Sequence, residues 1–479
     1  MNFNMEKEKR TRRLPSGLET LISMVLVIGV IVTGIRMGIG APMSLLLGTI
    51  VATVIALYLG NLWADIQKEM MRVISDSLVA IIIIMIVGMM IGVWMIGGTV
   101  PALIYYGIMV TTPAIILPMT FILCSLASLF TGTSFGTMST MGLALVGVGT
   151  GLGMPPHVVA GAAVSGAYFG DKMSPLSDTT NMAAGMTGTG LYEHIGSMLY
   201  TTIPATIVCI VAYALLGIRF AGDAVGDLAD IYILSDGIAS QFSYLPFTLL
   251  PAAMVLLVSA KKVPAILGLG LSLIISIFFA MLLQGADFAS VMRAAMTGYR
   301  SDTGVAIVDT LLTRGGLAMM QNTISLIILA CMMGGALTRS GILEVVANGM
   351  LKVVKKPAGL VVGTMASIYA ILLLSGNQVL GIIMGARAFK DTYEKMDVHP
   401  TVLSRAIESS TTIGAPLVPW STATIFATSV MGVTTAYIPY ALLGFVVPIF
   451  TLICAFTGFG MWKADGTPMW GKKKGVKPV

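Results

Sequence analysis

The sequence has little charge and few of the residues on which enzyme chemistry usually depends. Only 10% of its 479 residues are charged, and it holds three histidines and four cysteines, whereas 56% of the residues are apolar. Soluble domains carry about 25% charged residues, so this composition and a mean hydropathy of +0.92 indicate a polytopic membrane protein. The cysteines lie apart in apolar segments, without the spacing of a zinc site or a disulfide framework. No nucleophile–base set is apparent either, so we expect neither an enzyme nor a cofactor.

The net positive charge of the chain is carried largely by its two ends. The formal net charge is +6, and residues 1–17 and 463–479 are rich in lysine and arginine. Basic flanks of apolar segments favour the cytoplasmic side, so these ends suit cytoplasmic tails rather than nucleic-acid binding. The first apolar run, 18–36, lacks a small-residue cleavage site and is not expected to be a removable signal. We therefore expect a multi-pass membrane protein with both termini in the cytoplasm.

Glycine and proline interrupt several of the apolar runs. The runs predict roughly 10 to 12 membrane segments. The interruptions fall near 131–153, 170–190, 375–385 and 414–432. In lipid, an interrupted helix is tolerated only where its freed backbone groups face protein, water or an ion. These breaks therefore predict a cavity.

One stretch of the first half recurs in the second half. Residues 156–188 align without gaps on residues 400–432, at a constant offset of 244 (400 − 156). The identical pairs, ten in all, are Pro156/Pro400, Val158/Val402, Ala162/Ala406, Ser165/Ser409, Gly170/Gly414, Pro175/Pro419, Ser177/Ser421, Thr180/Thr424, Ala183/Ala427 and Gly188/Gly432. We interpret this as an internal duplication.

The distribution of lysine predicts how the two halves are oriented. At the same offset, Lys352, Lys355 and Lys356 fall opposite uncharged residues of the first half. Basic loops tend to face the cytoplasm, so one repeat is expected to be inverted relative to the other, although a parallel duplication remains the alternative. The predicted fold is an all-α membrane protein with repeats over 18–220 and 243–462, joined by an extramembrane linker over 221–242.

Three carboxylates stand beside the predicted breaks. Asp171 and Asp178 flank Pro175, which is expected to interrupt the helix between them, and Glu408 lies in the repeated block with Arg405 one turn earlier. An ionisable side chain inside a membrane is costly and marks a functional site. Burial disfavours the charged carboxylate and a bound cation favours it, so such a group can hold Na⁺ or H⁺ but not both. The alternative is that Asp171 with Lys172, or Arg405 with Glu408, forms a structural pair.

Short oxygen-bearing side chains surround these carboxylates. Na⁺ prefers several oxygen ligands from hydroxyls, amides and carbonyls together with a carboxylate. The candidate neutral ligands are Thr133, Ser134, Thr179, Thr180, Asn181, Asn377, Ser409, Thr412 and Thr424. Any one of them could instead satisfy the backbone of its own helix, as serine and threonine often do in membrane helices.

Four motifs carry a resemblance to a known family. They are GTSFGTMSTMG (132–142), GAYFGDKMSPLSDTTN (166–181), SGNQVLG (375–381) and RAIESSTTIGAPLVPWSTAT (405–424). Together they resemble the NhaC family of bacterial Na⁺/H⁺ antiporters over nearly the whole chain. The resemblance implies inverted repeats with paired re-entrant hairpins, a homodimer with a moving transport domain, and exchange of Na⁺ for H⁺. The family also includes members similar to malate–lactate exchangers.

The expected function is therefore secondary transport by alternating access, with Na⁺ and H⁺ as the exchanged ions. A carboxylate substrate would need a cationic partner, and Arg405 and Arg387 are the arginines nearest the breaks. Because Arg387 lies in a charged run and Arg405 has Glu408 as a neighbour on its helix, we favour cation exchange. A Na⁺/H⁺-coupled organic-anion exchanger of the malate–lactate type is the alternative.

Overall fold

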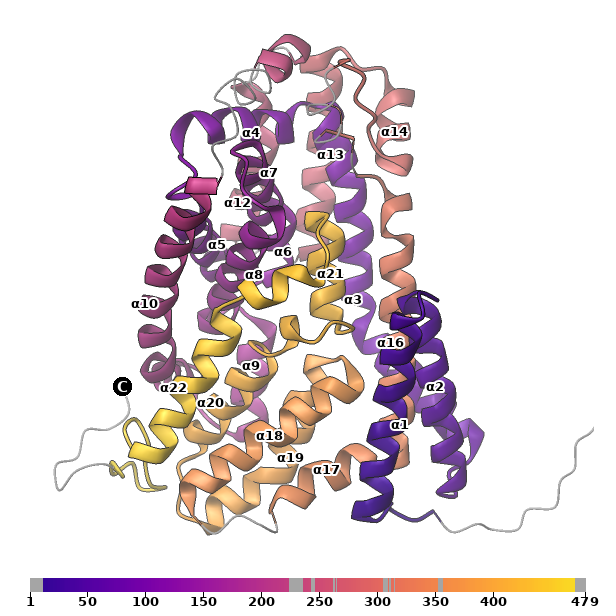
Figure 1. Cartoon of the computed structure of the whole chain (residues 1–479), viewed down its shortest axis with the longest axis vertical. Coiled ribbons are helices and arrows are strands. Elements are labelled where there is room, and N and C mark those ends of the chain that lie inside the picture. Colours follow the sequence, from indigo (N-terminus) through magenta and orange to yellow (C-terminus); the bar gives the residue numbers. More distant parts are fainter. Residues whose placement is uncertain are drawn as a thin grey trace, which may run out of the picture.

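Apolar helices build nearly all of this chain, as a membrane solvent requires (Figure 1). The computed structural model describes residues 12–223, 236–242, 246–261, 263, 265–304, 309, 312–313, 315–351 and 356–469. The greater part of both basic tails, most of the predicted linker, and Lys352 and Lys355 therefore lie outside the described residues. The described residues contain helices, turns and one isolated bridge between Trp462 and Pro468.

Seven helices of the described part are long and apolar enough to cross a membrane. They are α1 (Gly17–Arg36), α2 (Ala41–Tyr58), α3 (Trp63–Ile96), α10 (Leu191–Asp223), α13 (Ala265–Gln284), α16 (Gln321–Ser340, continuing the turn η3, Leu317–Met320) and α18 (Pro357–Ser375). Shorter apolar helices are α4 (Thr99–Val110), α5 (Ile116–Thr131), α21 (Thr422–Met431) and α22 (Leu443–Thr457). The protein is thus an all-helical, multi-pass membrane protein. Because α10 continues to Asp223, it passes the predicted repeat boundary at 220.

The remaining helices are shorter or more polar. They are α6 (Ser134–Thr137), the π-helix η1 (Met138–Gly142), α7 (Leu143–Gly151), α8 (Pro156–Met173), α9 (Asp178–Thr187), α12 (Leu250–Ala260), α14 (Phe288–Thr297), α17 (Ile342–Leu351), α19 (Gln378–Lys395) and α20 (Pro400–Thr411). Three single turns are η2 (Phe247–Leu249), η4 (Ala415–Leu417) and η5 (Thr435–Tyr440).

The duplicated blocks form matching elements. In each half a serine caps the helix after the break: Ser177 accepts a hydrogen bond from the backbone of α9, and Ser421 accepts the equivalent bond from α21. Both helices end at a left-handed glycine, Gly188 with φ 78° and Gly432 with φ 65°. Further upstream, α5 and α18 end at Gly132 and Gly376, which are the same 244 residues apart. Local sequence therefore fixes both breaks in both halves.

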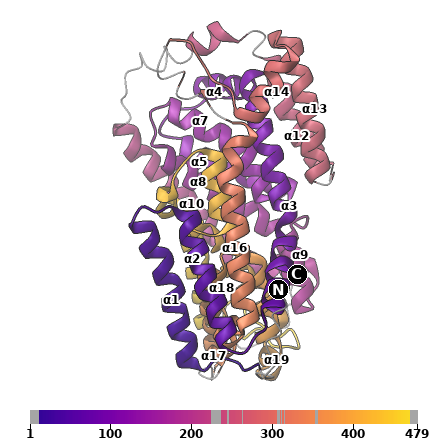
Figure 2. The ribbon, with the colours of Figure 1, turned by 90° about the vertical axis from the view of Figure 1, so that its right-hand side faces the viewer.

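Matching elements lie at different heights along the long axis. In Figure 1, α4 and α7 of the first half are in the upper part, whereas α17 and α19 of the second half are near the lower end. Helix α9 lies in the lower part and its counterpart α21 above it. Figure 2 shows α2 beside the lower part of α16, with α1 on the outer side of α2, and α13 and α14 beside the upper part of α3, which agrees with their contacts. The broken elements thus meet near the middle of the bundle.

Candidate functional site

Asp171 lies near the end of α8, where this helix approaches α5 closely. The approach depends on Gly170, because a Cβ there would come within 2.4 Å of the Leu129 backbone nitrogen. The carboxylate is 6% exposed. Its Oδ2 accepts hydrogen bonds from the Ser134 backbone N–H at 3.2 Å and the Ser134 hydroxyl at 2.6 Å, and its Oδ1 accepts from the Ser177 hydroxyl at 2.6 Å. Residues of both breaks of the first half therefore hold this side chain.

Glu408 lies on α20, in the second half, and its side chain is fully buried. Its Oε1 accepts hydrogen bonds from the hydroxyls of Thr412 at 2.7 Å and Thr179 at 3.1 Å. Its Oε2 finds no hydrogen-bond donor among the described residues. An unsatisfied buried carboxylate oxygen is costly, so this atom is a place where a cation or a proton would be stabilised.

Two hydroxyls join the carboxylates into one cluster. The Ser177 and Thr179 hydroxyl oxygens are 3.0 Å apart, and each contacts one carboxylate, Ser177 that of Asp171 and Thr179 that of Glu408. The cluster therefore combines acidic groups that are 237 residues apart in the chain (408 − 171). The sequence predicted each of these carboxylates as a site residue, whereas only the fold shows that the two lie in one site.

Lys172 adds a positive charge to the cluster. Its ammonium is fully buried and donates a hydrogen bond to the Ser409 hydroxyl at 3.0 Å. The ion pairs found in the described part of the chain are Arg13–Glu19, Arg72–Glu69 and Arg339–Asp65, and none includes Lys172. The alternative of a structural Asp171–Lys172 pair is therefore wrong. Adjacent residues of a helix point about 100° apart, which separates the two side chains.

A cavity of about 180 Å³ leads to Asp171. Asp178, the first residue of α9, is exposed and lines this cavity together with Asp76 of α3. Asp76 is not among the site residues predicted from the sequence, and it lies inside α3, which begins at Trp63. The overlooked signal was a carboxylate within a long apolar helix, which is costly in a membrane unless the residue faces water or an ion.

Comparison with known proteins identifies the family. Residues 166–459 match the model of the Na⁺/H⁺ antiporter family. The chain belongs to this family. It is 33% identical over 447 residues to the Na(+)/H(+) antiporter NhaC of Alkalihalophilus pseudofirmus, an alignment that covers 93% of this chain and 96% of the relative. The predicted family is therefore confirmed, and the protein is a secondary antiporter rather than an enzyme.

Other relatives in the family carry different names. The chain is 32% identical over 464 residues to the Malate-2H(+)/Na(+)-lactate antiporter of Bacillus subtilis, which covers 96% of this chain and 99% of that protein. It is 33% identical over 466 residues to the Arginine/ornithine antiporter ArcD of Halobacterium salinarum, with 96% and 95% covered. Membership alone thus establishes an antiporter but leaves its substrates open.

Arg405 of this antiporter lies away from the carboxylates. Its guanidinium is 1% exposed and donates to the carbonyl oxygens of Gly460 at 2.8 Å and Ser197 at 3.2 Å. It also lies over the Trp462 ring, 5.8 Å from the centroid. The alternative of an Arg405–Glu408 pair is wrong, because Arg405 reaches toward α10 and the segment after α22 whereas Glu408 reaches toward α9.

The predicted neutral ligands divide into two groups. Ser134, Thr179, Ser409 and Thr412 hydrogen-bond to Asp171, Lys172 or Glu408. The others bond to the backbone: Thr133 and Asn377 cap α6 and α19, and Thr180, Asn181 and Thr424 donate to carbonyl oxygens near the breaks. The first group is placed to contact an ion, and the second supports the loops that hold the first.

Proposed function

We propose that this antiporter exchanges Na⁺ for H⁺ by alternating access and that both ions use the cluster around Asp171 and Glu408. The observation that carries the proposal is the buried Oε2 of Glu408, which finds no partner among the described residues, beside the hydroxyls of Thr179 and Thr412. A carboxylate oxygen with neighbouring hydroxyl oxygens is the ligand set that a hard monovalent cation prefers. A proton on the same carboxylate would remove the need for the cation.

Counting charges gives a reason for exchange. With ionised carboxylates at Asp171 and Glu408 and an ammonium at Lys172, the cluster carries a net charge of −1. One Na⁺ or one H⁺ brings this sum to zero, whereas the empty cluster keeps its charge. Moving uncompensated charge through a low-dielectric region is costly, so the loaded states can reorient and the empty state cannot. Coupling follows because the two ions compete for the same cluster.

The cavity supports a cation rather than an organic anion as substrate. Aspartates 76, 171 and 178 line it, and none of its described lining residues is basic. A malate or lactate ion entering here would meet carboxylates of the same sign. One observation favours the malate–lactate type as a second candidate, since Lys172 donates to Ser409 alone among the hydrogen bonds found for it and could contact a substrate carboxylate.

The same proposal includes the larger architecture. We propose repeats over 18–220 and 243–462 in inverted orientation, which the different heights of α9 and α21 in Figure 1 support. The basic tails are proposed to be cytoplasmic, and the antiporter to act as a homodimer in the bacterial inner membrane.

The experiment that tests the function is proton flux in proteoliposomes that enclose a pH dye. Na⁺, Li⁺ and K⁺ are added in turn, followed by L-malate, L-lactate, arginine and ornithine, to wild type and to Glu408→Gln. We expect wild type to respond to Na⁺ alone and Glu408→Gln to lose at least 99% of this response. A flux that appears only with an organic anion or an amino acid would replace Na⁺/H⁺ exchange by the corresponding exchange.

A further inference from the structure

The cavity at Asp171 is one of three that share lining residues in series, and each of them is lined by a residue of α3. It shares Ile83 and Thr133 with a cavity of about 30 Å³, which in turn shares Thr140 with a third of about 210 Å³. On α3 the series runs from Asp76 in the first cavity to Trp94 in the third. At a rise of 1.5 Å per residue this is about 27 Å, close to the roughly 30 Å of a bilayer core. In Figure 1 the elements that line them run from α9 in the lower part, through α6, to α4 and α12 above.

We propose that this series is the second half of the transport path, through which the transported cation passes between Asp171 and the opposite face of the membrane. The inference rests on the proposed function, which names Na⁺ as the ion, and it adds the route that this ion takes. The narrow middle cavity is the selective part of that route. The threonines at positions 131, 137 and 140 are its ion-contacting residues, and Thr133 caps the helix that carries Thr137.

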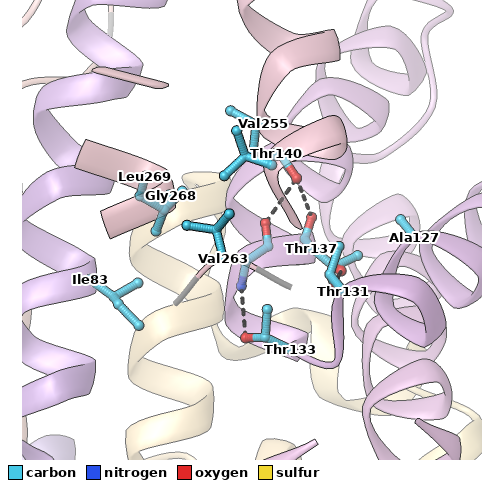
Figure 3. Close-up of a pocket in the computed structure, with 12 residues that line it drawn as sticks. Ile83, Ala127, Thr131, Thr133, Thr137, Thr140, Val255, Val263, Gly268 and Leu269 are labelled. Atoms are coloured by element: carbon cyan, nitrogen blue, oxygen red, sulfur yellow. Dashed lines mark hydrogen bonds between the residues drawn. The ribbon is translucent and has the colours of Figure 1, made fainter. Parts of the chain in front are cut away.

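The two walls of the middle cavity differ in chemistry. Figure 3 shows the four threonine side chains, from α5, α6, η1 and the residue that caps α6, on one wall. The opposite side in this view is apolar and includes Ile83 of α3 and Leu269 of α13, and Val255 of α12 lies beside Thr140. A passage with one oxygen-bearing wall lets an ion exchange part of its water shell for hydroxyls while the apolar wall limits its width.

The hydrogen bond that Thr140 donates makes its oxygen suited to a cation. Thr140 donates its hydroxyl hydrogen to the Gly136 carbonyl oxygen at 2.8 Å. Because the hydroxyl hydrogen of Thr140 is used in this bond to the backbone, the oxygen presents its lone pairs to a ligand. No residue that lines this cavity in the described structure is charged, so an ion would be held weakly enough to move on.

The size of the middle cavity adds a second constraint. A water molecule needs about 10–15 Å³ of such volume, so about 30 Å³ accommodates about two to three water-sized particles. A cation can enter only after losing much of its hydration shell, and each threonine oxygen then replaces part of what was lost. The π-helix η1, Met138–Gly142, directs Thr140 to this point, and such π-turns are frequent at functional sites.

The test compares Thr140→Val with Thr140→Ser and with the control Thr150→Val. Thr150 also donates to a carbonyl of its own helix, that of Val146 at 2.7 Å, but lines none of the three cavities. We expect Thr140→Val to lower the Na⁺-driven proton flux at least about tenfold, which is the effect of losing one oxygen contact to a charge. Thr140→Ser and Thr150→Val should stay within about twofold of wild type. Equal flux in Thr140→Val and Thr150→Val overturns the route.

A second measurement tests the proposal if Thr140→Val fails to fold. In a background whose four native cysteines are replaced and whose flux is intact, Thr140→Cys is treated with a small cationic thiol reagent. We expect the reagent to block flux, and Na⁺ to slow the block, whereas Thr150→Cys stays insensitive. An insensitive Thr140→Cys overturns the proposal. If the wild-type protein does not exchange Na⁺, the proposed function is wrong. The flux of the same variants is then measured with the substrate that the wild-type protein does transport.

Discussion

Lys172 is the residue on which the charge balance of the cluster depends. Its ammonium lies among groups contributed by both halves of the chain, with the Ser409 hydroxyl at 3.0 Å. Without it, the two carboxylates would need two monovalent cations rather than one to reach neutrality. Buried lysines are seldom retained without compensation, so this one is best understood as setting how many ions are carried.

Lys172→Met tests how many cations the cluster needs to become neutral. We expect the maximal rate of Na⁺-driven proton movement to fall at least about tenfold, because a single Na⁺ or H⁺ would leave the cluster with a charge of −1. The dependence of rate on Na⁺ concentration should become steeper than in wild type. Thr150→Val, on α7 and outside the cluster, is the control and should stay within about twofold. Unchanged flux in Lys172→Met would exclude Lys172 from the charge balance.

A substitution of Asp178 tests whether this carboxylate contacts the transported cation directly or attracts it from a distance. The sequence predicted this residue as a direct ligand, and the structure places it exposed at the cavity. Two unit charges about 4 Å apart in water interact by roughly 1 kcal/mol, a factor of about five in concentration. We therefore expect Asp178→Asn to raise the half-saturating Na⁺ concentration about fivefold at low ionic strength, and less at high ionic strength, with the maximal rate unchanged. Loss of the maximal rate in Asp178→Asn would instead show that Asp178 is a direct ligand of the ion.

At the scale of elements, the contact between α5 and α8 positions Asp171. Glycines 166 and 170 of α8 allow this approach, since a Cβ at Gly166 would come within 2.3 Å of the Phe121 carbonyl oxygen. Dense interiors respond to added volume by shifting backbone, and here a shift would displace the carboxylate that follows Gly170 directly.

Gly170→Ala should therefore destabilise the folded protein. We expect a loss of about 1–3 kcal/mol in the free energy of unfolding, the usual result of overpacking, together with weaker Na⁺ dependence. The matched control is Gly185→Ala on α9, because a Cβ at this helical glycine meets nothing within 4 Å. Alanine there should be neutral or stabilising by up to about 1 kcal/mol. Thermal unfolding in detergent measures both, and equal midpoints would show that the α5–α8 contact can relax.

Element boundaries are the part of this fold that sequence predicts well. The breaks at Gly132, Gly188, Gly376 and Gly432 carry their own signals, because glycine is the residue that adopts positive φ without strain and a polar N-cap stands nearby. Partners across the fold carry no such signal. Helical spacing placed Arg405 and Glu408 on neighbouring turns, but which element each reaches depends on packing against α9, α10 and the segment after α22. The ion pair predicted from spacing was wrong for this reason.

At the scale of the whole molecule, Arg405 connects three parts of the chain. From α20 it donates to Ser197 of α10 and to Gly460 after α22, and it lies over Trp462. These contacts join the end of the described chain to the helix that carries Glu408. Because the guanidinium donates to carbonyl oxygens and lines none of the three cavities described above, we propose a structural rather than a substrate-binding role for it.

Arg405→Met separates a structural role from anion binding. The substitution removes the donor from two carbonyl oxygens in a buried region, so we expect a loss of about 1–3 kcal/mol in the free energy of unfolding. The folded fraction should keep the ion selectivity of wild type in the proteoliposome assay. Arg387→Lys on the exposed side of α19 is the control and should change neither stability nor transport. If Arg405→Met instead retained its stability and lost a flux that depends on malate or lactate, this arginine would be an anion-binding residue, and organic-anion exchange would replace Na⁺/H⁺ exchange as the function.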